Sequence, residues 1–151
     1  MSDLNLSSCG PSVIADFGHA FCGTRLGVGI GREVFEFLPD LTKVVKIETS
    51  SRSFQNALEW ETWNDLGKTK HGKWLAPCRF ISPCGIVMIM DRTDPVRDGD
   101  MPGRIPEWLS DLKRENYGML NGQFVCHDYG RNLLLNHGAF AGKMVKRKWV
   151  R

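Results

Sequence analysis

The sequence predicts an α+β fold in which a small antiparallel sheet carries one helix and is followed by a linker and a shorter second part. Two observations predict this class. Alternating apolar and polar residues, interrupted by glycine turns, fill 26–48 and 74–91 and are typical of strands. One segment with helical spacing, 53–66, separates these two groups. Strands gathered around a single helix favour an antiparallel α+β arrangement.

The strands before the helix follow a loose lead-in. Residues 1–25 are small and polar, with room for one short strand near Val13–Ile14. Two strands joined by a tight glycine turn are expected between Leu26 and Phe37, because alternation resumes directly after the glycines. A third strand is expected at Lys43–Glu48, after a turn at the preceding proline.

The helix is expected from Ser53 to Leu66. Leu58, Trp63 and Leu66 recur at roughly helical spacing. Ser51 or Ser53 is the expected N-cap, and Gly67 is expected to end the helix.

The remaining elements are shorter. They are strands at 74–81 and 85–91, a hydrophilic linker at 93–104, a helical turn at 107–113, and a hairpin of 117–120 and 123–127 about Asn121–Gly122. The expected organisation is therefore a lead-in at 1–25, a sheet-bearing lobe at 26–92, a linker at 93–104 and a small second lobe at 105–151.

Composition restricts the class of protein. The 151 residues have room for one domain with a single core, and the apolar fraction of 42 % is ordinary for a globular protein. A net charge of +3 is too mild to predict nucleic-acid binding for the whole chain. No apolar run approaches the roughly 18 residues needed to cross a bilayer, so no membrane partner is expected.

The cysteines and the N-terminus predict a cytoplasmic protein. The five cysteines are an odd number without a Cys-x-x-Cys pair, which favours reduced thiols. The N-terminus lacks the basic start and apolar stretch of a signal peptide.

Basic residues crowd the last nine positions, at Lys143, Lys146, Arg147, Lys148 and Arg151. A solvated tail is the expected structure. An arm that docks on nucleic-acid phosphates or on an acidic partner is the alternative.

Glycines and one lysine suggest a phosphate site. Gly27 and Gly29 stand where backbone N–H groups approach phosphate without an intervening Cβ, although an ordinary glycine hairpin has the same pattern. Lys46, flanked by apolar residues in its strand, needs an anionic partner. Helix geometry selects Glu59, beside the apolar stripe, over Glu61, which shares the solvent face.

Four motifs resemble those of protein kinases. The segment Asp111-Leu112-Lys113-Arg114-Glu115-Asn116 resembles the catalytic loop D-L-K-P-E-N and differs only at Arg114. The glycine segment 26–34 is similar to G-x-G-x-x-G-x-V, with Arg32 in place of the third glycine. Val44-Val45-Lys46-Ile47 is similar to V-A-I-K. Asp128-Tyr129-Gly130 is similar to D-F-G and begins 17 positions after Asp111.

The resemblance implies a protein-kinase-like fold that binds ATP and magnesium in a cleft between two lobes. The residues that it implies as catalytic are Asp111, Lys113, Lys46 and Glu59. Those implied to bind the nucleotide are Gly27, Val28, Gly29, Val34, Lys46, Met90 and Asp91, the last two beside adenine. Those implied to hold magnesium are Asn116 and Asp128.

Two other segments were weighed against this assignment. Asp16-Phe17-Gly18 matches D-F-G literally, but it precedes the glycine segment and is therefore in the wrong order. His127 to Leu134 can be read as a catalytic loop, but its Asp-to-Asn spacing is one residue short. Asp111 as base with Asp128 as metal ligand explains more of the chain.

Three functions remain open. The first is a kinase-like phosphotransferase acting on serine or threonine of a protein, or on itself. The second is a pseudokinase-like module that binds nucleotide or a protein partner without turnover, since only 19 residues separate Asp91 from Asp111 and 21 follow Gly130, too few for a full second lobe. The third is nucleic-acid binding by the basic tail. A chain this short resembles compact kinase-like proteins of phages and bacteria, which would place a phage protein in the host cytoplasm.

Overall fold

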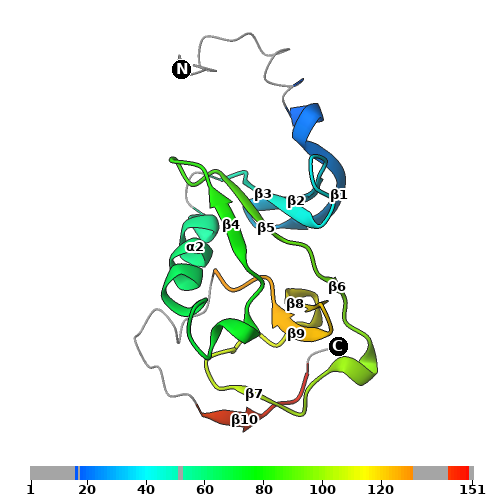
Figure 1. Ribbon diagram of the computed structural model, residues 1–151, viewed down its shortest axis with the longest axis vertical. Coiled ribbons are helices and arrows are strands. Elements are labelled where there is room, and N and C mark those ends of the chain that lie inside the picture. Colours follow the sequence, from blue (N-terminus) through cyan, green and yellow to red (C-terminus); the bar gives the residue numbers. More distant parts are fainter. Residues whose placement is uncertain (1–15, 17, 51–52, 131–142, 150–151) are drawn as a thin grey trace.

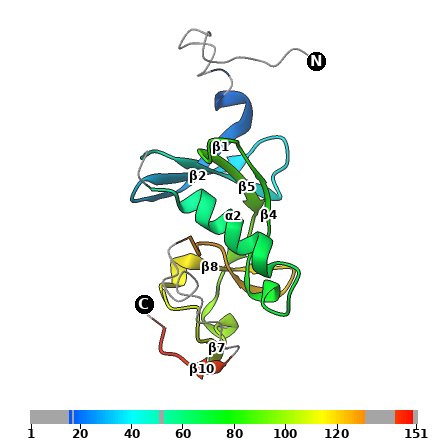
Figure 2. The ribbon, with the colours of Figure 1, turned by 90° about the vertical axis from the view of Figure 1, so that its left-hand side faces the viewer.

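The computed structural model describes residues 16, 18–50, 53–130 and 143–149. A five-stranded antiparallel sheet forms the upper part of the molecule in Figure 1. Its strands lie in the order β1 (Cys22–Gly29), β2 (Arg32–Phe37), β3 (Lys43–Glu48), β5 (Val87–Asp91), β4 (Cys78–Ile81). Helix α2 (Gln55–Leu66) connects β3 to β4 and packs on one face of the sheet (Figure 1 and Figure 2). The α+β class with antiparallel strands is confirmed.

Two smaller sheets form the lower part. Strands β6 (Asp94–Pro95), β8 (Tyr117–Leu120) and β9 (Gln123–Cys126) make one, and β7 (Arg104–Pro106) with β10 (Met144–Lys146) makes the other. The described residues also form the 3₁₀ turns η2 (Gly72–Trp74), η3 (Asp98–Asp100) and η4 (Arg114–Asn116). No described helix combines the length and apolar character needed to span a bilayer.

One hydrophobic core joins the two parts. Met88 and Met90 of the large sheet belong to the same buried cluster as Tyr117 and Phe124 of the β8–β9 hairpin. Trp108 is buried in that cluster as well, although it lies in a connecting loop. A continuous core fixes the two parts against each other, and therefore fixes the residues that lie between them.

The turn chemistry follows the sequence closely. Asn121 and Gly122 adopt φ values of 50° and 78°, the left-handed conformations that a two-residue hairpin turn requires. Gly31, with φ 83°, closes the turn between β1 and β2. The expected hairpins about these residues are both present.

The start of α2 differs from the expectation. Phe54 is the N-cap, in a left-handed conformation with φ 51°, and no side chain of that residue caps the helix. Glu48 caps the helix N-terminus instead, because its Oε1 accepts the backbone N–H of Asn56 at 2.7 Å. A carboxylate from the end of β3 thus satisfies the helix N-terminus. Ser53 accepts a hydrogen bond from the Gln55 side chain instead, and Ser51 lies outside the described residues.

Three other expected elements differ. The strand expected at 74–81 is shortened to β4, after η2, and the helical turn expected at 107–113 is replaced by η4 at 114–116. The first strand begins at Cys22, inside the expected lead-in, whose strand near Val13–Ile14 lies outside the described residues.

The segment 93–104 is not a free linker. Its strand β6 pairs with β8, and Val96 is buried. Arg114, the residue that departs from the catalytic-loop pattern, donates from Nε to the Val96 carbonyl at 3.2 Å and contacts Asp98. These contacts attach the segment to the loop that follows Asp111.

The backbone of the basic C-terminal segment is packed over 143–149, whereas the side chains of Lys143, Lys146 and Lys148 are exposed. Strand β10 pairs with β7, and Arg147 donates to the Glu107 carbonyl at 3.0 Å. The Trp149 ring lies 5.0 Å from Tyr117, and its indole N–H donates to the Pro102 carbonyl. Trp149 packs against the β8–β9 hairpin, and this aromatic contact holds the segment in place despite its positive charge. Arg151 lies outside the described residues.

Candidate functional site

A cleft of about 1180 Å³ opens between the large sheet and the β8–β9 hairpin. Eleven of the residues predicted from the sequence line it: Gly27, Val28, Gly29, Val34, Lys46, Met90, Asp91, Asp111, Lys113, Asn116 and Asp128. They come from both parts of the molecule and span about a hundred positions of the chain. Glu59 stands behind this lining, with 0 % of its surface exposed.

Lys46 reaches its partner from the middle of β3. The side chain is 4 % exposed, and Nζ lies 2.8 Å from Glu59 Oε2. Nζ also donates to the carbonyl of His127. The ion pair expected between Lys46 and Glu59 is therefore present, while Glu61 is exposed as the helical spacing predicts.

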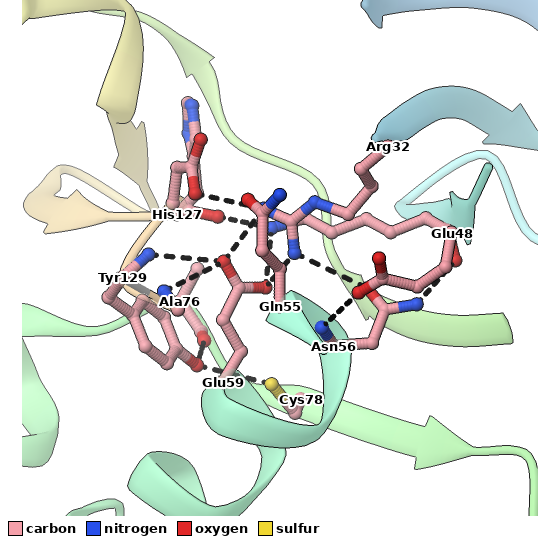
Figure 3. A network of polar contacts seen from close by, with 12 residues as sticks. Arg32, Glu48, Gln55, Asn56, Glu59, Ala76, Cys78, His127 and Tyr129 are labelled. Carbon is pink, nitrogen blue, oxygen red and sulfur yellow. Dashed lines mark hydrogen bonds and ion pairs between the residues drawn. The ribbon is translucent and has the colours of Figure 1, made fainter. Parts of the chain in front are cut away.

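Glu59 is the centre of a larger buried network (Figure 3). The two terminal nitrogens of Arg32 contact its two oxygens, each at 2.9 Å. Oε1 also accepts the backbone N–H groups of Tyr129 at 3.1 Å and Gly130 at 3.3 Å. Burial alone would raise the pKa of Glu59, but Arg32 and Lys46 outweigh it and lower the pKa to about 2.

Arg32 is the residue whose role the sequence analysis missed. Besides Glu59, its Nη2 lies 2.8 Å from Asp128 Oδ1, and its Nη1 donates to Asn56 Oδ1 at 3.3 Å. Burial tends to lower the pKa of Arg32, but Glu59 and Asp128 raise it overall, so the guanidinium stays charged. The sequence contains one indication of this role. Because side chains alternate along a strand, Arg32 shares a strand face with Val34, which the sequence predicts to line the cleft.

Asn56 and Gln55 connect helix α2 to the backbone of neighbouring strands and turns. Asn56 is fully buried, and its amide group donates to three backbone carbonyls, including that of Lys46 at 3.2 Å. The Gln55 side chain donates to the Ile30 carbonyl at 3.1 Å. Helix α2 thus presents a polar face to the cleft, and this face lies outside the apolar stripe that identifies a helix from sequence.

Asp111 is exposed and lines the cleft. Its backbone is held, because Tyr117 donates its hydroxyl to the Asp111 carbonyl at 2.9 Å. Tyr117 in turn packs against Trp149 of the C-terminal segment. Lys113 is exposed beside Asp111 and lines the same cleft.

The loop after Asp111 meets the segment after β9. The Asn116 carbonyl accepts the backbone N–H groups of His127 at 2.9 Å and of Asp128 at 3.3 Å. The two residues expected to hold magnesium are therefore neighbours. The side chain of Asp128 is 43 % exposed, whereas Asn116 is buried.

His127 braces the same junction. Its Nδ1 lies 2.7 Å from the Thr93 hydroxyl and its Nε2 lies 2.8 Å from the Glu115 carbonyl. Burial, and then the charge of Lys46, lower the pKa of His127, which favours the neutral imidazole. The sequence analysis considered His127 only within an alternative catalytic loop, whose later residues, 131–134, lie outside the described residues.

Met90 and Asp91, the residues expected beside adenine, differ in whether their side chains are free to contact a ligand. Met90 is fully buried and lines the cleft. The carboxylate of Asp91 is engaged by Lys43 at 3.2 Å and by Arg79 at 2.8 Å, so its side chain is occupied in ion pairs. The backbone N–H of Asp91 is occupied as well, because it donates to the Pro77 carbonyl at 2.9 Å.

No protein-family model matches the chain, and a search of curated proteins finds no significant match.

Magnesium fits this arrangement poorly. One of the two oxygens of Asp128, Oδ1, already accepts the Arg32 guanidinium at 2.8 Å. Among the described residues, no group of three or more His, Cys, Asp or Glu side chains is placed to hold a metal ion. A divalent cation on Asp128 would lie against a fixed positive charge, which opposes binding.

Proposed function

We propose that this chain is a protein-kinase-like domain that binds ATP in the cleft and transfers the γ-phosphoryl group to a hydroxyl. The observation that carries the proposal is the convergence on Glu59 of Lys46 at 2.8 Å and of the backbone N–H groups of Tyr129 and Gly130. This contact joins the lysine strand, the helix and the Asp-Tyr-Gly segment at the wall of one cleft. The antiparallel sheet with its helix fits the lobe that the sequence resemblance implies.

The nucleotide would lie with its base under the sheet and its phosphates toward the β8–β9 hairpin. Leu26, Val34 and Val44 offer an apolar surface of the kind that an adenine ring contacts. Lys46 and Lys113 offer positive charge to the phosphates. Lys113 pairs with no carboxylate of the described part of the chain, so its charge is available.

Asp111 is the group best placed to act as base. It would accept the proton of the acceptor hydroxyl while the hydroxyl oxygen forms a bond to the γ-phosphorus. The bond between that phosphorus and the β,γ-bridging oxygen breaks, and its electrons leave with ADP. A serine or threonine hydroxyl of a partner protein or of the chain itself is the proposed acceptor, in a reducing cytoplasm where the four described cysteines stay free.

A second function is favoured by the ion pair between Arg32 and Asp128. This contact occupies the carboxylate that phosphoryl transfer by a kinase would use for metal. A module that binds nucleotide without turnover and regulates a partner protein would tolerate that occupation.

To test this, the purified protein is incubated with γ-labelled ATP, with and without magnesium. Bound nucleotide, ADP and labelled protein are then measured. Lys46→Ala and Asp111→Asn are compared with Asp65→Asn, a matched change at an exposed helix position. Turnover that both cleft variants abolish and Asp65→Asn retains would support phosphotransfer. Bound nucleotide without turnover would support the binding module, and no binding by the unchanged protein would refute both.

A further inference from the structure

A buried arginine crosses the cleft to a carboxylate of the other part of the molecule. Arg32 and Asp128 are 96 positions apart in the chain, yet Nη2 and Oδ1 lie 2.8 Å apart. The arginine side chain is 5 % exposed and the aspartate side chain 43 % exposed. The cation is therefore part of the wall, and the carboxylate is the partner that faces the cleft.

Arg32 has little freedom to leave. Its terminal nitrogens also contact both oxygens of Glu59 and the amide oxygen of Asn56. Glu59 is fully buried, and withdrawal of the guanidinium would leave it with Lys46 as its only cationic partner among the described residues. Removing one partner of a buried charge network is strongly unfavourable, so Arg32 stays in place when ligands enter.

A metal ion on Asp128 would meet this fixed charge. Magnesium binds carboxylate oxygens at about 2.0–2.1 Å, which would place a divalent ion within roughly 5 Å of the guanidinium. Two like charges at that distance in a partly buried site repel strongly. Arg32 already supplies the positive charge that one Asp128 oxygen accepts, so a cation bound there would have to compete with a guanidinium held by its other partners.

We propose that the Arg32–Asp128 ion pair excludes divalent cations from Asp128, so that the cleft binds nucleotide as the metal-free anion. The nucleotide part rests on the proposed function, whereas the exclusion of metal does not. Lys46 and Lys113 then meet the phosphates without a bridging ion. The resemblance to kinases implies the opposite, a magnesium ion held by Asn116 and Asp128.

The first test measures ATP affinity by calorimetry, once with EDTA and once with magnesium chloride. The unchanged protein is expected to bind ATP more tightly with EDTA than with magnesium chloride, because magnesium converts most of the free anion in solution to its metal complex. Arg32→Gly is expected to bind at least about tenfold more tightly with magnesium than with EDTA, a difference of about 1.4 kcal/mol. Arg25→Gly removes the same charge from an exposed position of the same hairpin and should behave as the unchanged protein does. Binding by the unchanged protein that is as tight or tighter with magnesium than with EDTA would overturn the proposal.

The second test needs no nucleotide. Manganese is titrated into isotope-labelled protein, and the broadening of the backbone amide signals around Asp128 is followed by NMR. Broadening in Arg32→Gly that is absent from the unchanged protein, and lost again in Arg32→Gly/Asp128→Asn, would support exclusion by Arg32. Broadening in the unchanged protein would overturn it.

The two readouts separate the two proposals. Failure of nucleotide to bind under any condition would refute the proposed function, and manganese would still decide the exclusion of metal. Arg32→Gln is the alternative variant, because it keeps a donor for Glu59 while removing the charge. If neither variant folds, the two measurements on the unchanged protein decide the matter.

Discussion

Glu59 Oε1 accepts the backbone N–H of Tyr129 at 3.1 Å, across 70 positions of the chain. Through this bond, helix α2 holds the segment that carries Asp128. Because the same carboxylate binds Lys46 and Arg32, the position of the cleft's charged groups depends on one buried side chain.

Replacing Glu59 should change both stability and its dependence on pH. The folded pKa is lowered from 4.5 to about 2, so the carboxylate contributes stability that is present above pH 4.5 and is lost as the pH falls toward 2. The contribution is on the order of 3 kcal/mol. Glu59→Gln should be less stable at pH 7 by about that amount and lose less stability between pH 4.5 and 2 than the unchanged protein. Urea unfolding at several pH values measures both.

Glu61→Gln is the control, because Glu61 is exposed on the same helix. It should follow the unchanged protein throughout this pH range. Equal acid sensitivity of Glu59→Gln and the unchanged protein would contradict the buried network.

The C-terminal segment should prove structural. Trp149 packs edge-on against Tyr117 and Phe124, with ring centres 5.0 and 5.4 Å apart. Trp149→Ala should lower the free energy of unfolding by about 2–3 kcal/mol, because it opens a gap beside two aromatic rings. Lys148→Ala, at an exposed neighbour, should change it by less than about 0.5 kcal/mol.

If neither substitution changed the free energy of unfolding in thermal or urea experiments, the solvated tail expected from the charge pattern would be supported instead. Deletion of the segment is the poorer test of nucleic-acid binding, since it removes a strand paired with β7.

Gly118 should not tolerate a side chain. An added Cβ would lie 2.1 Å from the Thr93 hydroxyl oxygen and 3.0 Å from the Asp94 carbonyl. Gly118→Ala should therefore force β6 away from β8 and cost about 1–3 kcal/mol. Gly99→Ala places its Cβ in open space and should be nearly neutral. Comparable midpoints of urea unfolding for the two variants would show that β6 does not lie against β8.

Thiol reactivity should separate the cysteines. Cys84 is exposed, and hydrogen bonding from the Ile86 backbone lowers its pKa. Burial raises the pKa of Cys78 to about 12 and raises that of Cys126. Alkylation at pH 8, mapped by peptide mass spectrometry, should therefore modify Cys84 first and the two buried thiols only after denaturation. Early modification of Cys78 would contradict the packing of the core.

Local pattern was enough for much of the architecture. The Asn121–Gly122 hairpin and the strand at Lys43–Glu48 follow from turn chemistry and alternation, which act over a few residues. The choice of Glu59 as the partner of Lys46 followed from helical spacing alone. The helix N-cap was wrong because the group that satisfies it, Glu48, belongs to a preceding strand rather than to the helix's own cap residue.

The sequence by itself therefore determined the α+β class, the main strands and hairpins, and eleven of the residues that line the cleft. Only the tertiary structure decided which charged side chains form ion pairs with one another. The contact between Arg32 and Asp128 joins residues 96 positions apart, and the packing of Trp149 on Tyr117 joins the C-terminal segment to the hairpin. Neither leaves a periodic signal, because such pairs are selected by burial and by the balance of charge in the folded core.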